Sequence, residues 1–233
     1  DSGKALVERK GWLNGLGNDR DAPDALAAFA QAAELLRGGL AGSLREYALV
    51  DLRGEPVLLS GIDYHGQPAG YASQPDEVVN YVENHDNQTL FGVNAVKLPP
   101  ATSREDRARV QILGAATVAF AQGIAYYHAG VDTLRSKSLD RNSYNSGDWF
   151  NRLDWTYTDN NYAVGLPNDG DAATRALMKP FLANAAIKPT AADIAWTRDA
   201  FRDLIKIRAS TTLLRLRTAA DIKSRLSFHN LGS

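Results

Sequence analysis

Several residue types and patterns are missing from this sequence, and each absence narrows what the chain can do. There is no cysteine among the 233 residues, which excludes disulfides and thiolate metal sites. No apolar run reaches the roughly 18 residues that a transmembrane helix needs. Basic residues are scattered and nearly balance the acidic ones, giving a formal net charge of −1. We therefore expect no nucleic-acid partner and no membrane-spanning segment.

Common catalytic and ligand-binding motifs are equally scarce. The histidines, at positions 65, 85, 128 and 229, are far apart and show no His-x-x-x-His spacing, so no metal site is predicted. The chain has neither a Gly-x-Ser-x-Gly elbow nor a glycine loop of the kind that cradles phosphate. A Ser-His-Asp triad stays open, because its members need not be close in sequence.

The two ends of the chain carry further absences. The sequence begins "DSGKALVERK" without an initiator methionine or a signal peptide, and its only methionine is Met178. The last residues, "RLSFHNLGS" (225–233), have the pattern of one β-strand with no partner strand after it. We therefore expect a piece of a longer protein.

The periodic segments that are present predict an α/β architecture. A strand is expected at 78–83 and another at 124–130, with a helix between them that begins at a Thr102–Glu105 capping box and ends at Gly123. A helix between two strands is a βαβ unit, which implies a parallel sheet. Further helices are expected at 24–37, where Gly38 and Gly39 stop the helix, at 88–98 and at 191–210, with a hairpin at 47–59. In the last of these helices Ile194, Phe201, Leu204, Ile205 and the Arg208 stem fall on or near one apolar face.

Residues 131–190 are predicted to be mostly loop, which is far longer than usual connections. Six aromatic residues crowd between 144 and 162, which is too many for a disordered segment. The loop follows a parallel strand, at the edge where α/β folds place their sites. Planar rings flanked by Asp, Asn and Arg suit sugars, although a loop held in place by its own aromatics is an equally good interpretation.

His85 and Asp86 stand side by side after the first of the two strands, in "NYVENHDNQTLF" (80–91). Strict alternation would point them to opposite faces, so both serve one pocket only if the strand ends or bends there. A carboxylate there can act as acid, base, nucleophile or charge stabiliser, and an imidazole can donate to a substrate hydroxyl. Spacing alone slightly favours a different interpretation, in which Asp86 or Asn87 caps the next helix.

Three long segments, "EVVNYVENHDNQTLF", "GIAYYHAGVDTLRSKSLDRNSYNSGDWFNRLDW" and "NNYAVGLP", resemble type I pullulanases and limit dextrinases. These are debranching enzymes of the α-amylase superfamily. The resemblance implies the C-terminal part of a (β/α)8 barrel, with strand 7 near 78–86, strand 8 near 124–130, and flanking helices. Residues 1–215 are then barrel, with the substrate loop 131–190, and 216–233 begin a C-terminal β domain.

The same resemblance implies roles for individual residues. Asp86 would stabilise an oxocarbenium-like transition state, and His85 would donate a hydrogen bond at the same sugar subsite. Asn142 replaces a common Asp, and Asp132 a Glu common in the wider superfamily, which puts their roles in doubt. The remaining glucan-binding positions implied are Asn87, Arg141, Asn142, Tyr144, Asp148, Trp149, Asn151 and Arg152.

Retaining glycosidases need two carboxyls about 5–5.5 Å apart. In this family they lie in motifs resembling "FRFD" and "GEGW", and neither motif occurs in the chain. We do not expect Glu83 and Asp86 to be a self-contained pair. The isolated chain is thus predicted to be inactive and to need the remainder of its own catalytic domain.

The expected partner is an α-glucan such as pullulan or a limit dextrin, and no cofactor is predicted. Calcium in the intact parent is left open, and an extracellular or periplasmic location is favoured over a cytoplasmic one for a bacterial source. Two alternatives remain. One is a non-catalytic glucan-binding module derived from such a barrel, and the other is a structural or interaction protein.

Overall fold

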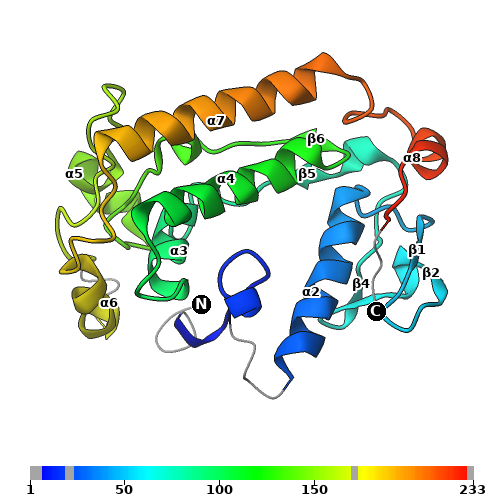
Figure 1. The fold of residues 1–233 in the computed structure, drawn as a ribbon, viewed down its shortest axis with the longest axis horizontal. Helices are drawn as coiled ribbons and strands as arrows, with labels where there is room; N and C mark the ends of the chain where they lie inside the picture. Colours follow the sequence, from blue (N-terminus) through cyan, green and yellow to red (C-terminus); the bar gives the residue numbers. More distant parts are fainter. Residues whose placement is uncertain (1–6, 19–23, 169–172, 230–233) are drawn as a thin grey trace. The chain divides into compact units, whose positions relative to one another are not determined.

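The computed structural model describes residues 7–18, 24–168 and 173–229, and the chain forms two compact units (Figure 1). The first unit comprises residues 1–18, 82–115 and 127–203, and the second comprises 19–81, 116–126 and 204–233. Within the described part of the chain, no helix is both long enough and apolar enough to span a bilayer.

The elements are helix-rich, with short strands. The α-helices are α2 (Ala25–Leu40), α3 (Leu90–Lys97), α4 (Arg104–Phe120), α5 (Gly147–Asn151), α6 (Arg175–Leu182), α7 (Ala191–Ser210) and α8 (Ala219–Arg225). The strands are β1 (Ala48–Val50), β2 (Pro56–Leu58), β3 (Asp63–Tyr64), β4 (Gln67–Pro68), β5 (Val79–Asn80) and β6 (Ile124–Ala125). The 3₁₀ turns are Leu16–Asn18, Leu59–Gly61, Pro75–Glu77, Val131–Thr133 and Ser143–Asn145.

The expected parallel pairing is present, because β5 pairs in parallel with β6 and the connection between them contains α3 and α4. The strands are much shorter than the predicted 78–83 and 124–130. In the second unit one face of this pair is packed and the other is open. Val78 is buried at 3% exposure, whereas Val79, Tyr81, Ile124 and Tyr126 are exposed. The rings of Tyr81 and Tyr126 pack edge to face, with centroids 5.9 Å apart. The β5–β6 pair therefore has an exposed apolar face, and no described residue of the second unit covers it.

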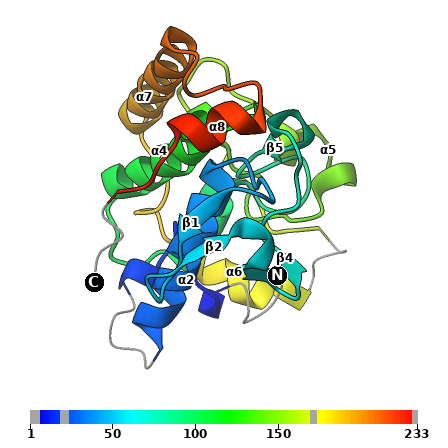
Figure 2. The same ribbon diagram turned by 90° about the vertical axis from the view of Figure 1, so that its right-hand side faces the viewer.

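The predicted hairpin and first helix pack against each other in the second unit (Figures 1 and 2). Strands β1 and β2 pair antiparallel around residues 51–55. The expectation that Gly38 and Gly39 stop α2 is wrong, because the helix continues to Leu40. A β-carbon at Gly38 would lie 3.1 Å from the side chain of Leu59. Glycine is thus kept here for close packing and not for a helix stop.

The ends of α4 are fixed by groups that differ from those predicted. The side chain of Ser103 accepts from the Asp106 amide at 3.1 Å, so Ser103 and not Thr102 is the N-cap. At the other end, the Arg208 guanidinium donates to the main-chain oxygens of Ala119, Ala121 and Gly123 at 2.8–2.9 Å. Arg208 therefore satisfies carbonyls that the helix end leaves unpaired.

Helix α7 has the predicted bounds, but its predicted apolar face is only partly right. Ile194 is fully buried and Leu204 is 8% exposed, whereas Ile205 is 37% exposed. In the first unit Ile194 joins a core with Phe91, Tyr162 and Met178. The described residues of 131–190 are mostly loop, as predicted, with the short helices α5 and α6 among them, and they supply part of this core.

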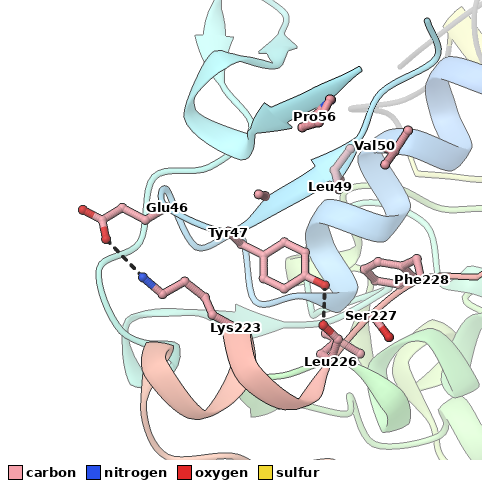
Figure 3. A pocket seen from close by; sticks show the side chains of 10 residues that line it. Glu46, Tyr47, Leu49, Val50, Pro56, Lys223, Leu226, Ser227 and Phe228 are labelled. Carbon is pink, nitrogen blue, oxygen red and sulfur yellow. Dashed lines mark hydrogen bonds and ion pairs between the residues drawn. The ribbon is translucent and has the colours of Figure 1, made fainter. Parts of the chain in front are cut away.

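Residues 226–228 of the second unit line a groove of about 410 Å³ (Figure 3). The Tyr47 hydroxyl donates to the Leu226 oxygen at 2.8 Å, and its ring packs edge to face on Phe228. At the rim of the groove, Nζ of Lys223 lies 3.4 Å from Oε2 of Glu46. The strand predicted at 225–233 is not formed at 226–229, and helix α8 precedes it; residues 230–233 lie outside the described part.

Candidate functional site

The segment that carries His85 and Asp86 is a turn between β5 and α3, so the strand ends before it reaches them. The Asp86 amide donates to Asn84 Oδ1 at 2.8 Å, which closes a local turn. Asn87 then has a φ of +58°, a left-handed conformation that asparagine tolerates better than most residues. Thr89, and neither Asp86 nor Asn87, caps α3 by accepting from the Gly92 amide. The helix-cap interpretation of Asp86 and Asn87 is therefore wrong.

The side chains of His85 and Asp86 lie on the same side of this turn. Nε2 of His85 is 3.5 Å from Oδ1 of Asp86, and the side chains are 80% and 69% exposed. A contact this exposed adds little to stability. Both groups are thus free to meet a ligand.

Glu83 is held differently, although it lies only three residues before Asp86. Its Oε2 accepts from the Leu90 amide at the first position of α3, and its Oε1 lies 3.2 Å from Nδ1 of His128. Only 2% of its side chain is exposed. Glu83 therefore braces the turn, and the geometry gives no support to a catalytic pair made of Glu83 and Asp86.

A buried lysine supports the backbone of the same turn. Nζ of Lys137 donates to the main-chain oxygen of His85 at 3.0 Å, and the residue is 2% exposed. Burial lowers the pKa of Lys137, and the charge of Arg135 adds to this lowering, while Asp140, Glu83 and Asp86 act in the opposite direction. The turn and the segment leading to the aromatic loop are thus joined by a charged hydrogen bond.

Residues 141–162, which we call the aromatic loop, present aromatic rings to solvent, and polar side chains of the same segment hold it together. Tyr144 is 83% exposed, and Trp149 is 67% exposed. The Asn151 side chain donates to the main-chain oxygens of Ser143 and Gly147, and it accepts from the Ser143 hydroxyl. Asn161 donates to the oxygens of Trp149 and Phe150. The rings are therefore carried on a turn that side-chain hydrogen bonds hold together, and the Asn151 side chain makes three of these bonds.

The other sequence-predicted residues lie on or near the surface of this loop. Asn142, Asp148 and Arg152 are exposed, and Arg141 is half-buried. The Asn142 amide donates to Oδ1 of Asp140, whose Oδ2 accepts from Ser146. Asp140 is fully buried and orders this stretch from within.

The described residues contain no cluster of three or more His, Cys, Asp or Glu side chains arranged to hold a metal ion. Asp132 is half-buried, and burial raises its pKa. It does not converge with other carboxylates in a cluster of that kind.

Sequence reasoning missed the residues that support the site. His128, Arg135 and Lys137 are 45 to 54 positions away from Glu83 along the chain, and nothing in their spacing reveals the contacts. One signal was available. Two basic residues, Arg135 and Lys137, fall between Leu134 and Leu139, and a basic side chain that is buried with such neighbours has to be hydrogen-bonded.

Comparison with known proteins gives the chain its relatives. Residues 157–233 match the family described as alpha-1,6-glucosidases, pullulanase-type, C-terminal. The chain is 45% identical to pullulanase 1, chloroplastic, of Arabidopsis thaliana, over 84% of this chain and 21% of the relative. It is 38% identical to a pullulanase of Klebsiella aerogenes, over 100% of this chain and 21% of the relative.

Solved structures agree with these sequences. An apo pullulanase from Klebsiella pneumoniae matches with a TM-score of 0.93 at 38% identity, covering 99% of this chain and 25% of that one. The same enzyme complexed with maltotriose also matches at 0.93, covering 22% of that chain. The chain spans about a fifth of the length of the relatives it matches. It is therefore a relative of the pullulanase-type α-1,6-glucosidases, similar along its whole length to one part of them.

Proposed function

We propose that this chain acts as part of a retaining debranching enzyme that hydrolyses α-1,6-glucosidic bonds in pullulan or branched dextrins. One observation carries the proposal. The exposed His85–Asp86 pair is bonded through Lys137 to the segment that leads into a loop with exposed Tyr144 and Trp149. A carboxylate and exposed aromatic rings, carried on segments that are joined to each other, are the two kinds of group that a sugar subsite uses.

In this proposal Asp86 stabilises the positive charge that develops on the sugar ring, and His85 donates to a hydroxyl of the same sugar. A carboxylate held at that point favours the oxocarbenium-like transition state over the ground state. The aromatic loop binds neighbouring glucose units, with Asn87, Arg141, Asn142, Asp148 and Arg152 as polar partners. The nucleophile and the acid/base come from the remainder of the catalytic domain.

The β5–β6 pair supports the finer structural part of the proposal, which is that these strands are the seventh and eighth of a (β/α)8 barrel. A parallel pair with an exposed apolar face needs further strands or helices to cover it. Tyr81 and Tyr126 would then pack inside the barrel, and residues 216–233 would lead into a C-terminal β domain.

The test is an assay of the whole protein that contains this chain against pullulan, with the 233-residue chain measured beside it. We expect reducing ends to be released, with retention at the anomeric carbon, by the whole protein and not by the chain. A whole protein that binds maltooligosaccharides without cleaving pullulan would instead favour a glucan-binding module. Absence of both binding and cleavage would refute the proposal.

A further inference from the structure

Three segments of the first unit are joined by one line of side-chain contacts that the proposed chemistry does not itself use. Oε1 of Glu83 lies 3.2 Å from Nδ1 of His128. Nε2 of His128 lies 3.4 Å from Nη1 of Arg135, whose Nη2 donates to the main-chain oxygen of Asn151 at 2.6 Å. The line therefore begins in the turn of Asp86 and ends in the aromatic loop.

The chemistry of the two ends assigns the hydrogen on His128. A guanidinium only donates hydrogen bonds, so the imidazole nitrogen that faces Arg135 has to accept. An ionised carboxylate only accepts, so the nitrogen that faces Glu83 has to donate. An imidazole that carries its hydrogen on Nδ1 and leaves Nε2 as an acceptor meets both requirements at once, and the opposite placement of the hydrogen meets neither.

The contacts are shielded from water, so losing one of them has a larger energetic cost than losing a surface contact. The side chains of Glu83 and His128 are 2% and 14% exposed, so water does not readily replace a lost partner. Burial lowers the pKa of Arg135, while the charge of Glu83 acts to raise it. Gly130, between His128 and Arg135, makes room, because a β-carbon there would lie 2.7 Å from the Arg135 stem.

Each end of the line fixes one loop. Glu83 also accepts from the Leu90 amide, so it closes the turn from 83 to 90 that carries His85 and Asp86. Arg135 holds the last residue of α5, the short helix that carries Trp149. His128 is the one side chain in this line that contacts both Glu83 and Arg135.

We propose that His128 is a positioning residue that keeps the His85–Asp86 turn in register with the aromatic loop. The proposal rests on the proposed glucan-hydrolysing function. It assigns the Nδ1 contact to catalysis, because that contact orients Asp86. It assigns the Nε2 contact to binding, because that contact orients the loop with the exposed rings.

The two contacts can be removed one at a time in the whole protein. His128→Asn keeps an amide donor near the Nδ1 position and loses the acceptor near Nε2. His128→Gln keeps an amide acceptor near Nε2 and loses the donor near Nδ1. With pullulan as substrate we expect His128→Gln to lower kcat about tenfold at a nearly unchanged KM, and His128→Asn to raise KM about tenfold at a nearly unchanged kcat.

Matched controls are His65→Asn and His65→Gln, because His65 is exposed and lies in the second unit. They should leave both constants unchanged. If the two His128 variants alter kcat and KM in the same way, or alter neither, the positioning role is refuted. If His128 only stabilised the fold, both variants would lower kcat and raise KM to the same extent.

Hydrogen exchange separates this proposal from the proposed function. We expect faster amide exchange at 84–90 in His128→Gln and at 143–151 in His128→Asn. If the unaltered whole protein cleaves no branched glucan, the proposed function fails, and the exchange pattern alone decides the positioning role. Exchange that rises equally in both segments, or in neither, overturns it.

Discussion

The ammonium nitrogen of Lys137 donates to the main-chain oxygen of His85 at 3.0 Å, across 52 residues of chain. A charged group is thus placed inside the first unit to hold the backbone of the proposed catalytic turn. This placement is costly, because burial disfavours the charged ammonium and Arg135 repels it. The contact therefore has a consequence for stability as well as for function.

Lys137→Met should change how stability depends on pH. The pKa of Lys137 in the folded chain is below its ordinary value of 10.5, so the unfolded chain binds more protons between those two values. The contribution of this lysine to the free energy of unfolding therefore rises as pH increases through the folded pKa towards 10.5, and falls again on acidification. Urea titrations of wild type and Lys137→Met across the alkaline range measure this. A parallel pH dependence in both proteins would contradict the assignment.

Asp86→Asn should leave the fold intact and reduce turnover strongly. The amide has the same shape but carries no charge to offset the positive charge developing on the sugar. Groups preorganised for such a charge are worth about 10²–10³ in kcat, and we expect a loss of that size on pullulan. Asp76→Asn is the control, because Asp76 is exposed in a turn of the second unit. Near-normal turnover by the Asp86 variant would refute its role.

Tyr144→Ala should weaken glucan binding without altering stability. The ring is 83% exposed, so it contributes almost nothing to the core, but it offers a flat face to a sugar. Losing that contact should weaken maltooligosaccharide affinity about tenfold by calorimetry. Tyr64→Ala, which removes an exposed ring from the second unit, should have no effect. Equal affinity of both variants would exclude Tyr144 from the binding surface.

Strong local patterns made much of the fold predictable. Helix α7 has the predicted bounds, because a long amphipathic run specifies a helix without help from the rest of the chain. The 47–59 hairpin and the parallel β5–β6 pair also follow from short-range signals. The polar run after β5 allows the turn at His85 and Asp86 but does not specify it, and the strand expected near 78–86 ends at Asn80.

The supporting contacts were not predictable, because they depend on tertiary packing. Gly38 has the pattern of a helix stop, and only the proximity of Leu59 shows why glycine is needed inside the helix. Glu83 and His128 are 45 residues apart, and neither residue type by itself indicates a buried partner. The segment 131–190 folds through side-chain amides that bond main-chain oxygens, and such bonds leave no periodic trace in a sequence.

Ser103→Ala should destabilise α4 more than Thr102→Ala does. Ser103 Oγ accepts from the amide of Asp106, the third residue of the helix, whereas Thr102 precedes the cap and contributes its main-chain oxygen to Arg107. Loss of an N-cap costs about 1 kcal/mol, and an exposed serine offers no compensating packing when it is replaced. Thr102→Ala leaves that main-chain contact in place and should fall within the error of a urea titration. Equal losses of unfolding free energy in the two variants, or a larger loss for Thr102→Ala, would show that Ser103 is not the N-cap and would favour Thr102, as the sequence pattern predicts.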